Sequence, residues 1–69
     1  MNSNKLKAAI VEAGYSQRKL AAIIPMALNT LNAKVNGKNP ITIDEAIMLS
    51  EKLNLSDEKF DEIFLEKSS

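Results

Sequence analysis

The sequence predicts an all-α fold, in which five short helices pack into one compact domain over residues 1–69. Apolar residues recur at spacings of three and four, the period of a helix face, and no segment alternates as a β-strand does. The two glycines, Gly14 and Gly37, each follow such a segment, at a position where helices favour a residue with positive φ. Thr42 and Glu45 form a capping-box pattern, which marks the start of another helix.

The first two helices are expected over about residues 4–13 and 16–24. Ser16 is placed to accept hydrogen bonds from the free N–H groups of the second helix. Pro25 ends that helix, because the residue before a proline disfavours the helical conformation. The apolar face of the first helix consists of Leu6, Ala9, Ile10 and Ala13. The second helix contributes the apolar residues Leu20, Ala21, Ile23 and Ile24.

The remaining helices are expected over about residues 27–36, 43–54 and 57–65. Ser56 is a capping residue for the last of them, and acidic residues follow it at the positive end of the helix dipole. The inner face of the fourth helix is expected to comprise Ile43, Ala46, Ile47, Ser50 and Leu53 or Asn54, with Leu49 beside it. The apolar stripe of the fifth helix consists of Phe60, Ile63 and Phe64.

The composition narrows the classes of function. The absence of cysteine excludes disulfides and cysteine metal sites, and the absence of histidine removes the commonest metal ligand and general base. A chain this short buries only ~60% of its unfolded surface, which leaves little room for a substrate pocket. We therefore expect a cytoplasmic protein without enzyme activity, cofactor, metal, membrane segment or small-molecule substrate. One carboxylate cluster is better explained by a helix start than by a metal site; it contains Asp57, Glu58, Asp61 and Glu62.

The charges are unevenly distributed, although the net charge is zero. Residues 1–40 carry six cations and one carboxylate, a net charge of +5, whereas residues 41–69 carry three cations and eight carboxylates, a net charge of −5. Such a dipolar molecule can turn its basic end towards phosphates and its acidic end away from them. Chance and the acidic helix starts are the alternative explanation of this asymmetry.

The segment from Ser16 to Gly37 has the pattern of two short helices joined by a tight turn. It resembles the helix-turn-helix of the lambda repressor family, also called the Cro/CI or XRE family, and the resemblance covers most of the chain. The matching residues are Ser16, Gln17, Leu20, Ala21, Ile24, Met26, Leu31, Asn36, Gly37 and Lys38. Small phage members of the family are also similar at Thr30-Leu31, Lys34-Val35-Asn36-Gly37-Lys38, Glu45-Ala46 and Ile63-Phe64.

The resemblance implies a phage or mobile-element repressor, or another transcription regulator, that binds operator DNA in the cytoplasm of a bacterial host. The helix over residues 27–36 would lie in the major groove of double-stranded DNA. Two copies of the chain would bind a pseudo-palindrome as a homodimer, through a C-terminal region that includes Phe60, Phe64 and Leu65. Alternatively, Phe60 and Phe64 simply close the core. Candidate DNA-binding residues are Gln17, Arg18, Ala27, Leu28, Asn29, Thr30, Asn32, Ala33, Lys34, Asn36, Lys38 and Asn39.

Asparagines on the outer face of the third helix support this hypothesis independently. An Asn amide can pair with N6 and N7 of adenine. Asn is a poor helix former, so the presence of both Asn29 and Asn32 in one short helix indicates that they have a function there. An ordinary solvated face is the alternative, but Leu28 is expected to be exposed beside them, which suggests a partner surface. Arginine, the commonest reader of guanine, is absent from this helix, so we expect it to read mainly A·T pairs.

Three residues depart from the family pattern. Pro25 stands where the family usually has glycine, and because proline cannot adopt positive φ the turn must differ from the common form. Ala27 replaces the usual capping Ser or Thr, so the third helix is expected to lack a side-chain cap. Lys34 stands where many relatives have a buried aliphatic residue; its stem can pack while its ammonium reaches either solvent or a phosphate.

A second hypothesis is that the same fold serves as a protein-interaction module, such as an antitoxin or an anti-repressor. The acidic last third and the zero net charge are compatible with it. A gel shift on DNA at low salt would distinguish the two hypotheses.

Overall fold

The computed structural model describes residues 1–66, so the last three residues of the expected domain lie outside the described part. Over this range the chain forms five α-helices and no strand. The helices are α1 (Ser3–Glu12), α2 (Gln17–Ile23), α3 (Leu28–Val35), α4 (Ile43–Leu53) and α5 (Asp57–Phe64).

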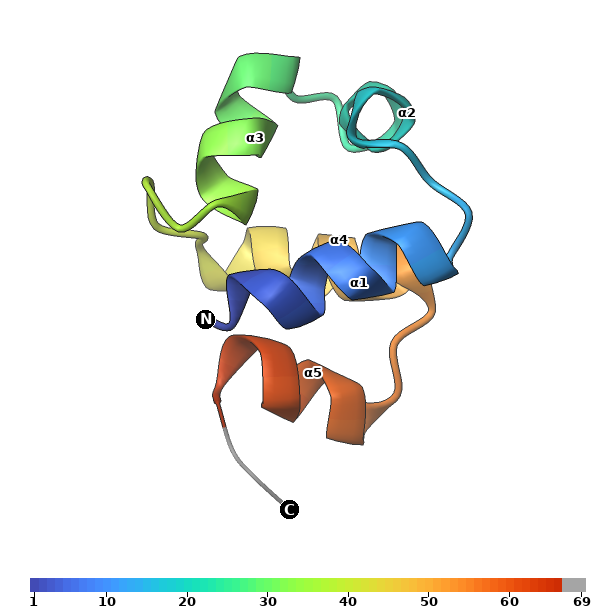
Figure 1. Ribbon diagram of the computed structural model, residues 1–69, viewed down its shortest axis with the longest axis vertical. Coiled ribbons are helices and arrows are strands. Elements are labelled where there is room, and N and C mark those ends of the chain that lie inside the picture. Colours follow the sequence, from blue (N-terminus) through green and yellow to red (C-terminus); the bar gives the residue numbers. More distant parts are fainter. Residues whose placement is uncertain (67–69) are drawn as a thin grey trace.

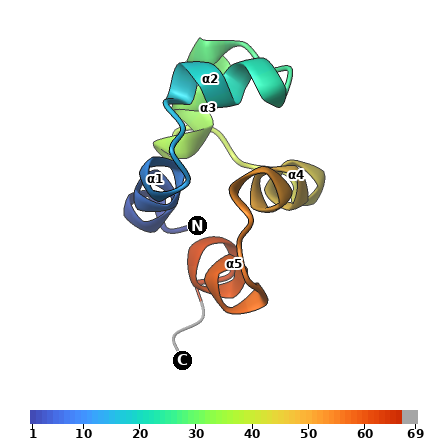
Figure 2. The same ribbon diagram turned by 90° about the vertical axis from the view of Figure 1, so that its right-hand side faces the viewer.

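The helices are arranged along an elongated body of 33 × 23 × 20 Å. α2 and α3 lie together at one end of the long axis, and their axes cross steeply, since α2 is seen end-on where α3 runs along the page (Figure 1). In the perpendicular view, α1 and α4 lie on opposite sides of the middle of the molecule, and α5 closes the other end (Figure 2). The α2–α3 pair is therefore presented at the end of the molecule opposite α5.

All five helices contribute to one hydrophobic core. The largest fully buried side chains are Leu6 of α1, Leu20 of α2, Leu31 and Val35 of α3, and Ile63 of α5. Leu49 and Leu53 of α4 are buried in the same cluster. Burial of these residues, at roughly 1.5–3 kcal/mol each relative to exposure, fixes the position of α3 on the scaffold.

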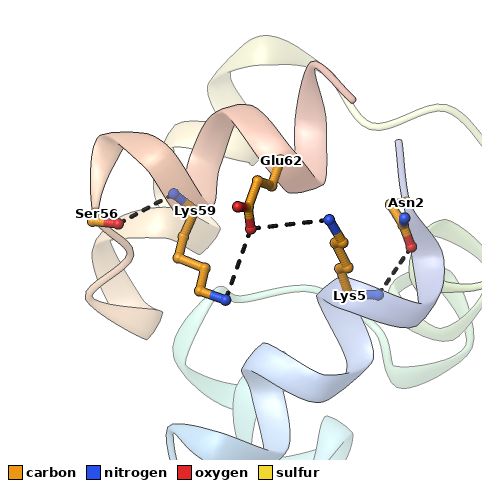
Figure 3. Close-up of polar contacts among 5 residues, drawn as sticks. All are labelled: Asn2, Lys5, Ser56, Lys59 and Glu62. Atoms are coloured by element: carbon orange, nitrogen blue, oxygen red, sulfur yellow. Dashed lines mark hydrogen bonds and ion pairs between the residues drawn. The ribbon is translucent and has the colours of Figure 1, made fainter. Parts of the chain in front are cut away.

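Side-chain caps begin the helices where the sequence predicts them. Ser16 Oγ accepts from the backbone N–H of Lys19 at 3.1 Å, and Thr42 and Glu45 form the complete capping box of α4. Ala27, the N-cap residue of α3, provides no side-chain cap, as expected. One cap was not predicted: Asn2 Oδ1 accepts from the N–H of Lys5 and so starts α1 (Figure 3).

α1, α3 and α4 each end with a residue of positive φ. Each end also has a backbone hydrogen bond from the N–H of residue i to the carbonyl of residue i−5. The positive-φ residues are Gly14, Gly37 and Asn54. α2 makes the same bond, from Met26 N–H to the Ala21 carbonyl at 3.0 Å, but the residue before Met26 is Pro25. Pro25 is not among the residues with positive φ in the described part of the chain. The turn of the α2–α3 motif therefore differs from the glycine form, as the sequence predicts.

The inner face of α4 was predicted wrongly in part. Ile43 is 77% exposed and Ile47 is 45% exposed, whereas Ala46, Leu49 and Leu53 are buried. Both sets of residues have helical spacing, so the sequence pattern alone does not say which stripe faces the core. Because α4 lies at the side of the molecule, only one of its apolar stripes can face the core. Ile43 and Ile47 belong to the stripe that faces away from the core.

The ends of α1 and α5 are tied together by polar contacts. Asn2 N–H donates to the Ile63 carbonyl at 2.7 Å, and Glu62 Oε2 lies 4.0 Å from Lys5 Nζ and 3.8 Å from Lys59 Nζ (Figure 3). Both lysine side chains are more than half exposed, so these ion pairs add little to stability. Among residues 1–66, no helix has the length and apolar character needed to cross a bilayer.

Candidate nucleic-acid interface

α3 has a core side and an outer side. Leu31 and Val35 are buried, and four polar residues are exposed on the rest of the helix and its end: Asn29, Thr30, Asn32 and Asn36. The structure therefore leaves Asn29 and Asn32 accessible, as the DNA-binding hypothesis requires. Ala33, directly after Asn32, is half-buried, and Ala27 is exposed just before the helix.

Leu28 lies differently from expectation. It was expected on the exposed face of α3, but it is half-buried and packs against the hydrophobic core. The physical reason is its spacing, since Leu28, Leu31 and Val35 follow the i, i+3, i+7 pattern of a single apolar stripe. Leu28 is thus a weaker candidate for a base contact than Asn29, which is exposed one residue later.

Asn32 and Asn36 form a hydrogen-bonded pair on the outer side of α3. Asn36 Nδ2 donates to Asn32 Oδ1 at 2.9 Å. A carbonyl oxygen has two lone pairs and an amide nitrogen has two donors. Asn32 therefore keeps one acceptor site and its Nδ2 donor, the combination that pairs with the N6 and N7 edge of adenine.

Lys34 lies on the flank of α3 that faces α4. Its Nζ is 2.5 Å from Oε2 of Glu45, and the two side chains are 17% and 21% exposed. The ammonium of Lys34 was expected to reach either solvent or a phosphate, but it lies instead in an ion pair within the protein. The hydrogen bond from Lys34, aided by one from the backbone of Thr42, holds the pKa of Glu45 below its ordinary value.

Glu45 is the residue of this region that sequence reasoning missed. Its role in the capping box was predicted, but its contact with Lys34 was not. The two residues are 11 apart in the chain and belong to different helices, so no local spacing indicates the contact. A lysine in place of a buried aliphatic residue was the available signal that some carboxylate lies nearby.

The remaining candidates surround α3. Gln17 is half-buried at the start of α2, followed by the exposed side chains of Arg18 and Lys19. Lys38 and Asn39 are exposed in the loop after α3, where the N–H groups of both bond to the Ala33 carbonyl. Within residues 1–66, Arg18, Lys19 and Lys38 take part in no ion pair. Their charges are therefore accessible to a polyanion.

The described residues contain no group of three or more carboxylates placed to hold a metal ion. Asp57 and Glu58 lie in the first turn of α5, at the positive end of its dipole.

Two short helices that cross steeply, the second with exposed amides and flanking cations, define a helix-turn-helix DNA-binding domain. Comparison with family models agrees: residues 6–60 match the family described as Helix-turn-helix. The protein belongs to this family, the XRE or lambda repressor-like helix-turn-helix proteins, which bind double-stranded DNA. The expected family is confirmed, and so is the all-α, five-helix fold over residues 1–66. Comparisons with curated proteins and with solved structures gave no match.

Proposed function

We propose that this protein is a sequence-specific repressor of phage or mobile-element type, which acts in the cytoplasm of a bacterial host by inserting α3 into the major groove of an operator. The exposed amides of Asn29 and Asn32 on the outer side of α3 carry this proposal. Side chains of this type at the front and outer face of a recognition helix read base edges. Repression then follows from occlusion of RNA polymerase and needs no chemistry.

The operator core is expected to be rich in A·T pairs. The one cation of α3 is Lys34, and it is engaged by Glu45. Bidentate recognition of guanine by Arg or Lys is therefore not provided by α3, whereas Asn amides pair with adenine. Ala33 and Ala27 offer small apolar groups for the methyl group of thymine.

Phosphate contacts are proposed on both sides of α3. Gln17 and Arg18 at the start of α2 would contact phosphates of one DNA strand. Lys38 and Asn39 in the α3–α4 loop would contact phosphates of the other DNA strand. With so few contacts a single copy of the chain should bind weakly and with strong dependence on salt.

A homodimer on a pseudo-palindrome would supply the missing affinity, and we propose that its contact lies in the C-terminal region. A hollow of about 450 Å³ lies between the start of α4 and the end of α5, and its lining includes Ile43, Phe60, Phe64 and Leu65. Phe60 and Phe64 are half-buried, with ring centroids 4.9 Å apart, and Leu65 is 53% exposed. These side chains leave apolar surface for a second copy.

Selection of binding sites from random DNA by the purified protein tests this function. We expect an enriched A·T-rich site with two-fold symmetry, and loss of its binding in Asn29→Ala and Asn32→Ala. Asn4→Ala, which removes an exposed amide from α1, serves as the control. Enrichment of a core made only of G·C pairs would contradict the proposed readout. No DNA binding even at low salt would favour a protein-interaction module instead.

A further inference from the structure

We propose that Glu45 is a positioning residue of the DNA interface, which keeps the ammonium of Lys34 away from phosphates so that α3 reads bases with neutral side chains alone. This inference rests on the proposed function. By this inference Glu45, which lies in α4 outside the α2–α3 motif, controls how strongly α3 binds DNA of any sequence.

The first argument is the way in which Glu45 is anchored. Its Oε1 accepts from the N–H of Thr42 at 3.0 Å, and its own N–H donates to Thr42 Oγ1 at 3.1 Å. Its Oε2 is left to bind Lys34 Nζ. Because the capping box holds the carboxylate on α4, it is Lys34 that must stay beside Glu45, rather than Glu45 that follows Lys34 towards solvent.

The second argument is electrostatic. The first turn of α4 presents free N–H groups and the positive end of the helix dipole, and Lys34 brings a further positive charge to the same place. The carboxylate of Glu45 lies between these like charges and makes their proximity favourable. If Glu45 were neutral, the start of α4 would repel Lys34, and the flexible four-carbon stem would let the ammonium move out to solvent.

The third argument concerns what a free Lys34 would do on DNA. Lys34 precedes Lys38 and Asn39, which are the proposed phosphate contacts at the end of α3. An ammonium released there adds a contact that is independent of sequence, and each such contact steepens the dependence of log K on log salt by about 0.9. Binding to all duplexes would then strengthen, and the ratio of specific to non-specific affinity would fall.

Glu45→Gln separates the charge from the cap, because the glutamine side-chain oxygen can still accept from Thr42. Dissociation constants for the selected operator and for an unrelated duplex are measured by fluorescence anisotropy across about 50 to 200 mM salt. We expect this variant to bind the unrelated duplex several-fold more tightly than wild type, with a salt dependence steeper by about 0.9. The preference for the operator should fall correspondingly.

Lys34→Met keeps the apolar stem and supplies the matched control. Alone, it should leave the salt dependence of wild type unchanged, because the wild-type ammonium contacts no phosphate. In the Glu45→Gln background it should restore the wild-type salt dependence, which a purely structural role of Glu45 does not predict.

Three results would overturn the inference. They are an unchanged salt dependence in Glu45→Gln, a shallower one in Lys34→Met alone, and failure of the double variant to restore it. If Glu45→Gln does not fold, the salt dependence of DNA binding by Lys34→Met alone still tests whether the wild-type ammonium contacts a phosphate. Absence of sequence preference in the wild-type protein would instead show that the proposed function itself is wrong.

Discussion

Asn36 donates a hydrogen bond from its side-chain amide to the side-chain oxygen of Asn32, one helical turn earlier on the outer side of α3. An isolated asparagine at the surface can rotate its amide freely and present either its oxygen or its nitrogen to a ligand. The bond from Asn36 fixes which end of Asn32 is the acceptor. Asn32 is thereby pre-organised for a partner that donates to its oxygen and accepts from its nitrogen, and adenine is such a partner.

The first prediction follows from this pair. Asn36→Ala should relax the preference for adenine at one position of the operator, and Asn32→Ala should abolish that preference. The full effect of a bidentate amide contact is about 1–3 kcal/mol of discrimination, and we expect Asn36→Ala to lose part of it. Competition binding with operators substituted at each position measures the change. Equal loss of affinity for all sequences in Asn36→Ala would instead indicate a phosphate contact for Asn36.

The second prediction concerns the pH dependence of stability. The pKa of Glu45 is lowered in the folded protein, first by the hydrogen bond from Lys34 and then by the backbone of Thr42. A lowered pKa means that the ionised carboxylate stabilises the fold above its ordinary pKa of 4.5, and that this contribution is lost as the pH falls through the lowered value. The charges that face the carboxylate are Lys34 on α3 and the positive end of the α4 dipole.

Urea unfolding of wild type and Glu45→Gln at a series of pH values measures this effect. Wild type should be the more stable protein near neutral pH, and the difference should shrink below about pH 4.5 as the carboxylate is protonated. Glu51→Gln, which removes an exposed carboxylate from the same helix, controls for the change in net charge. A difference between wild type and Glu45→Gln that persists undiminished in acid would show that the ionic contact does not stabilise the fold.

Local signals account for most of what the sequence predicted. Caps such as Ser16 and the Thr42–Glu45 box depend on neighbours within three residues, so they can be recognised without knowledge of the fold. The orientation of α4 depends on what packs against it. Its two apolar stripes have equal spacing, and only the tertiary structure buries the stripe of Leu49 while leaving that of Ile43 exposed.

The third prediction tests this orientation. Leu49→Ala should lower the free energy of unfolding by about 2–5 kcal/mol, because it opens a cavity in the core. Ile43→Ala should change it by less than about 0.5 kcal/mol, as expected for an exposed position. Chemical denaturation of both variants gives the comparison. A large loss of stability in Ile43→Ala, measured on the monomeric chain without DNA, would mean that this side chain is buried in the core and that the orientation of α4 is wrong.

In the candidate site, too, some features follow from local sequence signals and others depend on tertiary packing. The asparagines of α3 could be recognised from their residue type on the outer face of a short helix. The half-buried position of Leu28 and the pairing of Lys34 with Glu45 could not, because they depend on how close α3 lies to the core and to α4. Sequence reasoning thus found the groups that could face DNA, but not the contacts that orient or restrain them.

The fourth prediction concerns the two glycines with positive φ. Gly14 has φ +83° and open space around an added Cβ, whereas at Gly37, with φ +79°, a Cβ would lie 3.2 Å from Ser3 Oγ. Alanine at either position should destabilise the fold by roughly 1–2 kcal/mol, because L-residues disfavour the left-handed conformation. Gly37→Ala should be the more harmful variant, since Ser3 must also move. Thermal unfolding compares the two, and a smaller loss in Gly37→Ala than in Gly14→Ala would contradict this explanation.

The fifth prediction is that the α3–α4 loop contacts the DNA backbone through Lys38. A phosphate contact carries no sequence information, so Lys38→Gln should weaken binding to operator and to unrelated DNA by similar factors. It should also make the dependence of log K on log salt shallower by about 0.9, the value expected for one lost phosphate contact. Lys52→Gln is the matched control, because Lys52 is equally an exposed lysine but lies in the last turn of α4, in the acidic half of the chain. If both variants reduced the salt dependence alike, the attraction would come from the overall charge of the protein, and the loop would have no particular place at the interface.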